Sequence, residues 1–315
     1  MKNSSYLVNK NIFTDEFEKV SVDAIINEIK LNGYFSFEKA ITNQVLIDIE
    51  KKATESMLNF NQNNISGVFA EKQYFFTNLL SVSKSFYDFV TSKLVLDTCE
   101  KYMGNSFRLT ALRYYETYGK HHMQWHTDNK TDKEFSKFPG LIFICYLSDV
   151  NDGQFQYIKG SHLWSSKRDF NDYSDEFIEQ NHKHEIKNFK HPRGSIIIYN
   201  THGIHRAKPV MNSNFIRKSI FFQVDNITNN SEPILLNTNF IDKIEDKIFM
   251  FLGFGRPANY KIFPKTSLNT LPLSKDFIIK IVKYIPYRLM RALFNFSPNF
   301  IKKLIRDFVK KIELK

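Results

Sequence analysis

The apolar positions in the first third of the chain recur at the spacing of a helix. Three stretches have this spacing: residues 22–31, 42–57 and 77–103. Asn32-Gly33 is a typical helix end, and the aromatic run at 34–37 predicts a short strand between the first two helices. This region is therefore predicted to be rich in helix.

From Phe107 the pattern changes to short apolar runs separated by turn residues. Four runs have the length and composition of strands: residues 108–118, 141–147, 195–199 and 219–224. No amphipathic helix is predicted between them, which favours an antiparallel sandwich or barrel over a doubly wound parallel sheet. Helical periodicity returns from Asn237 onward.

Composition limits the class of protein. The chain has 315 residues, of which 42% are hydrophobic and 24% charged, as in a globular protein with a buried core. No uncharged apolar run reaches the ~18 residues of a membrane span. The N-terminus is too polar for a secretory signal, and Cys99 and Cys145 are too few for a disulfide framework. These features predict a cytoplasmic protein.

The net charge of +11 is concentrated near the C-terminus. Residues 280–315 contain ten basic and two acidic side chains, while the rest of the chain is nearly neutral. Between 299 and 314, apolar residues share one helical face and lysines the other, which is typical of a helix on an anionic membrane. We expect residues 277–315 either to make peripheral contact with the inner face of a membrane or to pack on the core. Nucleic acid is not expected, because no base-reading motif accompanies the lysines.

One His-x-Asp pair, His126 and Asp128, occurs in the chain. Residues i and i+2 of a strand point to the same face, so an imidazole nitrogen and a carboxylate could reach one point. Two such ligands and a distant histidine form the facial triad of non-haem Fe(II) proteins. A solvated pair on a loop is the alternative interpretation.

A second group of polar residues follows Gly194. The apolar strand there leads to a turn with two histidines, His202 and His205, and twelve residues beyond His205 the next strand opens with Arg217. A guanidinium inside a barrel needs an anion, and a carboxylate bound in a two-pronged pair would supply it. A surface ion pair is the alternative for Arg217.

Together, four motifs resemble the phytanoyl-CoA dioxygenase family, whose members are Fe(II)- and 2-oxoglutarate-dependent oxygenases on a double-stranded β-helix. The motifs are His126-x-Asp128, Asp152 to His162, Gly194 to His205 and Ile216 to Ile220, and the likeness extends from about Gly33 to Val224. We therefore expect a mainly β protein with flanking helices. Its predicted parts are a helix-rich region at 1–104, a double-stranded β-helix (jelly-roll) core at 105–228 and a basic helical extension at 229–315.

The resemblance implies a role for each site residue. His126, Asp128 and His205 would bind Fe(II), with His205 preferred to His202 because it is twelfth from Gly194. Arg217 would hold the distal carboxylate of 2-oxoglutarate. Arg113 and Tyr115, on the strand before the His126 loop, are further candidates for co-substrate contacts.

The implied reaction is hydroxylation with O₂ and release of succinate and CO₂. Asp128 fills the position at which halogenating relatives have a small residue, which favours hydroxylation. The expected substrate is a small molecule, a lipid-linked compound or an envelope glycan. The alternative function is a catalytically silent β-helix protein that binds a ligand in the same pocket, and a sugar-binding sandwich with incidental histidines is a third.

Two positions depart from the family's pattern, and the role of one insert is left open. Lys159 replaces the family's proline before Gly-Ser-His, and Ala207 stands where relatives often have a small hydroxyl residue. The polar insert at 163–193 could cover the mouth of the barrel or form a solvated loop with a short helix.

Overall fold

The computed structural model describes two units, Met1–Thr270 and Leu271–Lys315, each treated by itself. The described residues are 11–60, 67–70, 73–76, 78–119, 123–128, 130–131, 134–135, 139–164, 173–212, 214–226, 231–232, 234–242, 245–254, 285–286, 289, 293–294, 296–298 and 300–302. The elements and the site discussed below belong to the first unit.

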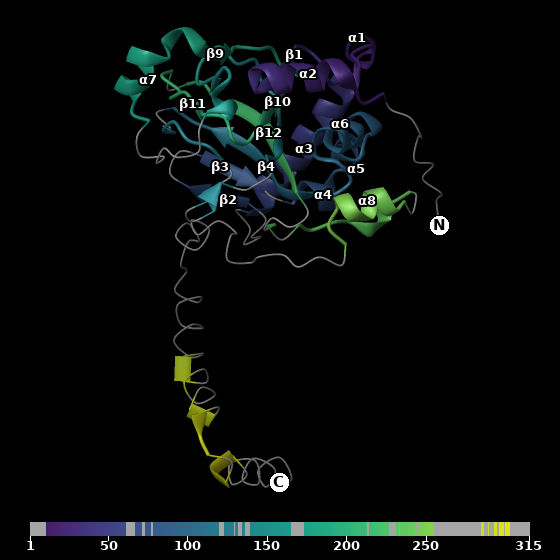
Figure 1. Ribbon diagram of the computed structural model, residues 1–315. Helices are drawn as coiled ribbons and strands as arrows, with labels where there is room; N and C mark the ends of the chain where they lie inside the picture. The colour runs from purple at the N-terminus through teal and green to yellow at the C-terminus, as the bar shows by residue number, and fades with distance from the viewer. Residues whose placement is uncertain are drawn as a thin grey trace. The chain divides into compact units, whose positions relative to one another are not determined.

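A seven-stranded antiparallel sheet is the centre of this unit (Figure 1). In spatial order its strands are β1 (Tyr34–Phe37), β10 (Ile196–Asn200), β7 (Leu141–Tyr146), β12 (Arg217–Asn226), β4 (Phe107–Thr117), β3 (Gln73–Phe76) and β2 (Gly67–Ala70). The four strand predictions correspond to β4, β7, β10 and β12 and are confirmed. β12 lies between β7 and β4, with a bulge after Gln223.

A second, three-stranded sheet faces the first. It contains β11 (His205–Ala207), β8 (Phe155–Ile158) and β9 (Ile186–Phe189), and a separate ladder pairs β5 (Lys130–Thr131) with β6 (Glu134–Phe135). From β7 to β12 the chain passes repeatedly between the two larger sheets, because β8, β9 and β11 belong to one and β7, β10 and β12 to the other. The two sheets therefore enclose an interior between them.

Helices make up the rest of the architecture. They are α1 (Asp15–Glu18), α2 (Val22–Asn32), α3 (Asn43–Phe60), α4 (Leu79–Val82), α5 (Lys84–Val90), α6 (Lys93–Met103), α7 (Asp175–Asn181) and α8 (Asp246–Phe251), with 3₁₀ turns at Ser161–Leu163, Lys183–Glu185 and Thr238–Phe240. The predicted helix at 77–103 is divided in three, because the hydroxyls of Ser83 and Ser92 cap the backbone N–H of Phe86 and Val95 and start new helices. The helical layer is extensive, so the fold is mixed α/β with antiparallel sheets.

The two faces of the seven-stranded sheet meet different partners. Phe143, Cys145 and Phe222 point to the helical side, where Phe86 and Phe89 pack against them in the main core. Their neighbours Ile144 and Tyr146 point to the interior and pack against the three-stranded sheet. Figure 1 shows α3, α5 and α6 on one side of the large sheet, with β9, β11 and α7 grouped away from them.

The described part of the insert at 163–193 contains the short helix of one prediction, as α7, but it is packed on the fold rather than being a solvated loop. β9 pairs with β8 and completes the three-stranded sheet. Ile178 of α7 packs with Trp125 and Ile204 in a small separate core, and Asp175 forms an ion pair with Arg206. Apolar packing thus makes this part of the insert a piece of the fold. None of the helices among the described residues is long and apolar enough to cross a membrane.

Candidate metal centre

The candidate site begins with a pairing between two loops. The backbone N–H of His126 donates to the carbonyl of His205 at 3.0 Å, and the N–H of His205 donates back to His126 at 2.9 Å. Asp128 N–H donates to the carbonyl of Thr201 at 3.1 Å. The prediction that His126 and Asp128 lie on a regular strand is wrong. Instead, this isolated bridge holds them beside the start of β11.

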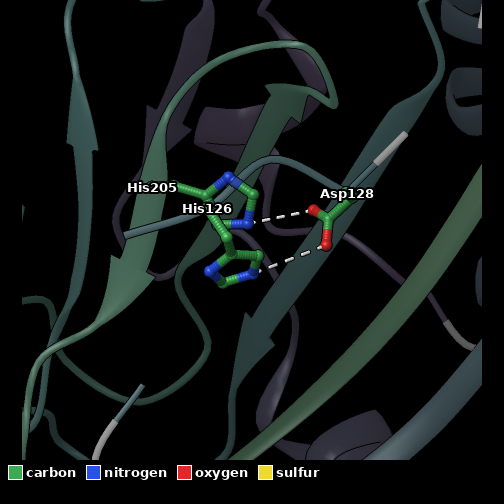
Figure 2. Close-up of side chains that lie close together, drawn as sticks. All are labelled: His126, Asp128 and His205. Atoms are coloured by element: carbon green, nitrogen blue, oxygen red, sulfur yellow. Dashed lines mark ion pairs between the residues drawn. The ribbon is translucent and has the colours of Figure 1, made fainter. Parts of the chain in front are cut away.

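Three side chains converge at this point (Figure 2). Nε2 of His205 lies 3.0 Å from Oδ2 of Asp128, and Nε2 of His126 lies 3.7 Å from Oδ1. One donor atom from each residue falls within 4.8 Å of the others. This is the donor set of a facial triad, with two imidazoles and one carboxylate around a single point. In the described part of the chain, His202 is not a member of this cluster.

Backbone carbonyls fix the orientation of both imidazoles. Nδ1 of His126 lies 2.8 Å from the carbonyl of Gln124, and Nδ1 of His205 lies 3.0 Å from the carbonyl of Gly203. A carbonyl only accepts hydrogen bonds, so Nδ1 carries a hydrogen in each ring and Nε2 is the nitrogen that could bind a metal. In both rings this nitrogen is the one nearest Asp128, an arrangement that is common around protein-bound metals.

Tyr199, at the end of β10, holds the carboxylate of Asp128. Its hydroxyl donates to Oδ2 at 2.9 Å and lies 3.4 Å from Nε2 of His205. Its ring packs against Phe155, with the centroids 4.8 Å apart. Tyr199 was not among the predicted site residues, although the alternation of side chains along a strand places it on the opposite face of the sheet from Ile198.

Tyr157 and Gly203 shape the other side of His205. The Tyr157 ring is nearly parallel to the imidazole, at 6.3 Å and 10°. A Cβ atom at position 203 would lie 1.7 Å from the Tyr157 hydroxyl oxygen, so only glycine fits this turn. The turn that carries the distal histidine is thus packed against the three-stranded sheet.

The electrostatics of the cluster favour the ligand forms. Burial raises the pKa of Asp128, but the neighbouring His205, with its hydrogen bond, together with His126 and Tyr199, outweighs this and brings the pKa to about 2. Burial and the neighbouring His205 lower the pKa of His126. An ionised carboxylate beside a neutral imidazole is the state that binds a metal cation. The site is open on one side, since the His126 side chain is 32% exposed and that of His205 only 3%.

Arg217 opens β12 on the interior face. Strand register places it on the same face as Tyr199, through the pairs Tyr199–Ile142 and Ile142–Gln223. Its guanidinium is buried and donates to the carbonyl of Gly153 and, at 3.2 Å, to the hydroxyl of Thr117.

Among the described residues, no carboxylate forms a hydrogen bond with the Arg217 guanidinium; the nearest influence of this kind is the charge of Asp152. The Nε of Arg217 is buried with no hydrogen-bond partner. Burial lowers its pKa, but a guanidinium stays protonated in proteins. A buried cation with a spare donor fits a carboxylate ligand.

Arg113 and Tyr115 are also on the interior side of β4 but have partners of their own. Arg113 forms an ion pair with Glu232 and lies over the ring of Phe221 at 5.7 Å. It also donates to the Tyr115 hydroxyl at 3.4 Å. Their predicted role as co-substrate contacts stays a prediction. Thr117, which was not among the predicted site residues, accepts a hydrogen bond from Arg217 at 3.2 Å.

Comparison with known proteins shows the fold. No protein-family model matches the chain, and no curated protein sequence matches it. SnoK, a non-haem α-ketoglutarate-dependent carbocyclase of nogalamycin biosynthesis, is similar with a TM-score of 0.54 and 12% identity, over 72% of this chain and 92% of SnoK. HygX from Streptomyces hygroscopicus, solved with nickel and 2-oxoglutarate bound, has a TM-score of 0.51 and 12% identity, over 69% of this chain and 92% of HygX. The antiparallel sheets are thus those of a 2-oxoglutarate oxygenase fold of the double-stranded β-helix type.

Proposed function

We propose that the protein is an Fe(II)- and 2-oxoglutarate-dependent dioxygenase of the phytanoyl-CoA dioxygenase type. The observation that carries the proposal is the cluster of His126, Asp128 and His205, in which both Nε2 atoms face one carboxylate. A fold shared with SnoK and HygX supports it, as does the 2-oxoglutarate bound to HygX. The residues present fit the metal, because two imidazole nitrogens and one carboxylate face a single point and leave one side open.

Arg217 and Thr117 would bind the co-substrate. The spare Nε of Arg217 would donate to the distal carboxylate of 2-oxoglutarate, and the Thr117 hydroxyl lies 3.2 Å from the same guanidinium. Members of the phytanoyl-CoA dioxygenase family often have a small hydroxyl residue two positions after the distal histidine, where this chain has Ala207. Thr117, from the neighbouring strand β4, would supply the missing hydroxyl group.

The remaining residues of the site would hold its geometry. Tyr199 fixes the Asp128 carboxylate, the carbonyls of Gln124 and Gly203 fix the two imidazoles, and Phe155 and Tyr157 exclude water from the His205 side. With iron, 2-oxoglutarate and O₂ bound, the chemistry supplied is oxidation of a substrate C–H bond coupled to conversion of 2-oxoglutarate to succinate and CO₂.

Hydroxylation is the reaction type that the ligand set favours. Asp128 is a carboxylate held by Tyr199, so no ligand position is left vacant for a halide. The substrate would be a small molecule, a lipid-linked compound or an envelope glycan, and it would approach the cluster from the open side at His126. A catalytically silent protein that binds a dicarboxylate at Arg217 is the alternative function.

Turnover of the co-substrate distinguishes the two functions. The purified chain, loaded with Fe(II) under anaerobic conditions, should convert 2-oxoglutarate to succinate when O₂ is admitted, and panels of lipid and sugar substrates should accelerate it. Isothermal titration with Ni(II) and 2-oxoglutarate measures binding separately. Binding of both without any succinate, with every substrate tried, would favour the silent binding protein.

A further inference from the structure

Five large apolar side chains of the second unit are exposed to solvent. They are Ile285, Leu289, Leu293, Phe296 and Phe300, with exposed fractions from 49% to 91%. A single exposed leucine is ordinary, but several at neighbouring positions mark an interaction surface. We call these five side chains the C-terminal apolar stripe.

The stripe has the spacing of one helical face. Positions 285, 289, 293 and 296 are separated by four, four and three residues, which places them side by side on a helix. The backbone is helical at 285–286, 289, 293–294 and 296, and again at 300–302 after Pro298. On a helix, this spacing places the side chains of 285, 289, 293 and 296 on one face.

Charge complements the apolar character of this surface. The sequence from 285 to 302 contains Arg288, Arg291 and Lys302 and no acidic residue. Apolar side chains can enter the boundary between headgroups and acyl chains, while basic side chains are attracted to anionic lipid. A nucleic acid would match the charge but would offer no apolar phase to leucine and phenylalanine.

We propose that the second unit docks on an anionic membrane surface through the C-terminal apolar stripe, whose side chains insert among the lipid headgroups. The binding partner of the stripe is a lipid bilayer that contains acidic phospholipid. Each basic side chain near such a leaflet strengthens partitioning roughly fivefold, so three of them with the inserted stripe give reversible adsorption. The docking is independent of iron and 2-oxoglutarate.

Co-sedimentation of the full chain with vesicles tests the proposal. Vesicles of phosphatidylcholine with phosphatidylglycerol should bind the protein, and vesicles of phosphatidylcholine alone should bind it much less. High salt should weaken the binding, because it screens the basic side chains. Leu293→Glu should weaken it roughly fivefold or more, because it adds a negative charge at the leaflet.

A matched variant controls for the substitution itself. Leu31 is 69% exposed on α2 and Leu293 is 68% exposed, so Leu31→Glu makes the same change at equal exposure outside the stripe. Leu31→Glu should bind vesicles like the original chain. Equal binding to neutral and anionic vesicles, or equal binding by Leu293→Glu, would overturn the proposal.

Self-association gives a second decisive outcome. If sedimentation velocity without vesicles shows a dimer that Leu293→Glu dissociates, the stripe is an interface between copies and the membrane proposal fails. A monomer that binds anionic vesicles supports it. Because no arm requires metal or co-substrate, failure of the oxygenase proposal leaves this result interpretable.

Discussion

The two faces of the seven-stranded sheet are both buried, but they differ in chemistry. The face toward the helices is apolar around β7 and β12, where Phe143 and Phe222 stack with their ring centroids 4.6 Å apart. The face toward the three-stranded sheet carries Tyr199 and Arg217. Burying a polar or charged group is unfavourable unless it has partners. The helix-facing side therefore stabilises the fold, and the interior side carries the polar groups of the proposed site.

We expect substitutions on the interior face to reduce function, and substitutions on the helix-facing side to reduce stability. The largest effect is expected at the metal cluster itself. His205→Ala removes a proposed ligand whose Nε2 lies 3.0 Å from Asp128, so iron-dependent succinate formation should be abolished. Titration with Ni(II) should show the loss of binding directly.

His202→Ala is the matched control for this variant. His202 lies three residues away on the same turn, and its backbone N–H donates to the Asn200 side chain at 2.8 Å, a bond that alanine keeps. The variant should retain metal binding. If His202→Ala lost the metal and His205→Ala kept it, the distal ligand would have to be reassigned.

On the opposite face, the expected effect is on stability alone. Phe222→Ala removes a buried ring that stacks on Phe143, and such truncations lower the free energy of unfolding by about 3–5 kcal/mol. Urea unfolding of the apo chain measures this loss. Below the transition, the affinity for 2-oxoglutarate should match that of the original chain; a large fall in that affinity would mean that the two faces are not separable.

Part of this division could be read from the sequence. β7 has six consecutive buried residues and β10 five, and such apolar runs are recognisable without a structure. β8, β9 and β11 were not predicted, because they have three or four residues each and include polar members such as Gln156 and Asn188. The three-stranded sheet is created by pairing between short segments, and no local pattern announces it.

The site shows the same limit. His126 and Asp128 were found because a two-residue spacing is a local signal. Tyr199 lies 71 positions from Asp128, and Glu232 lies 119 from Arg113, so both contacts depend on the tertiary fold rather than on any motif. The buried Nε of Arg217, which indicates an anionic ligand, likewise becomes visible only when its surroundings are known.

A smaller effect on function is expected at Arg217. Arg217→Lys keeps the positive charge but loses the fork of donors, and disrupting a buried guanidinium–carboxylate pair costs on the order of 2–5 kcal/mol. Because lysine keeps the charge, we expect a loss at the lower end of this free-energy range. The 2-oxoglutarate concentration needed for half-maximal succinate formation should then rise by roughly tens-fold or more. Metal binding should persist, and succinate formation at varied 2-oxoglutarate measures the change. An unchanged requirement would remove Arg217 from the co-substrate site.

The smallest effect tests whether a single hydroxyl on the interior face positions the metal carboxylate. Tyr199→Phe keeps the ring that packs on Phe155 and removes the donor 2.9 Å from Oδ2 of Asp128. Since partners of metal ligands typically contribute about 10–100-fold to metal affinity, Ni(II) binding should weaken by roughly tenfold. Tyr157→Phe is the control, because its ring stacks on the same His205 while its hydroxyl donates to the carbonyl of Asn200 at 3.2 Å. If Tyr199 positions the carboxylate, metal binding should weaken in Tyr199→Phe alone. If both tyrosines are merely structural, the two variants should show equal small losses of stability and the same metal affinity.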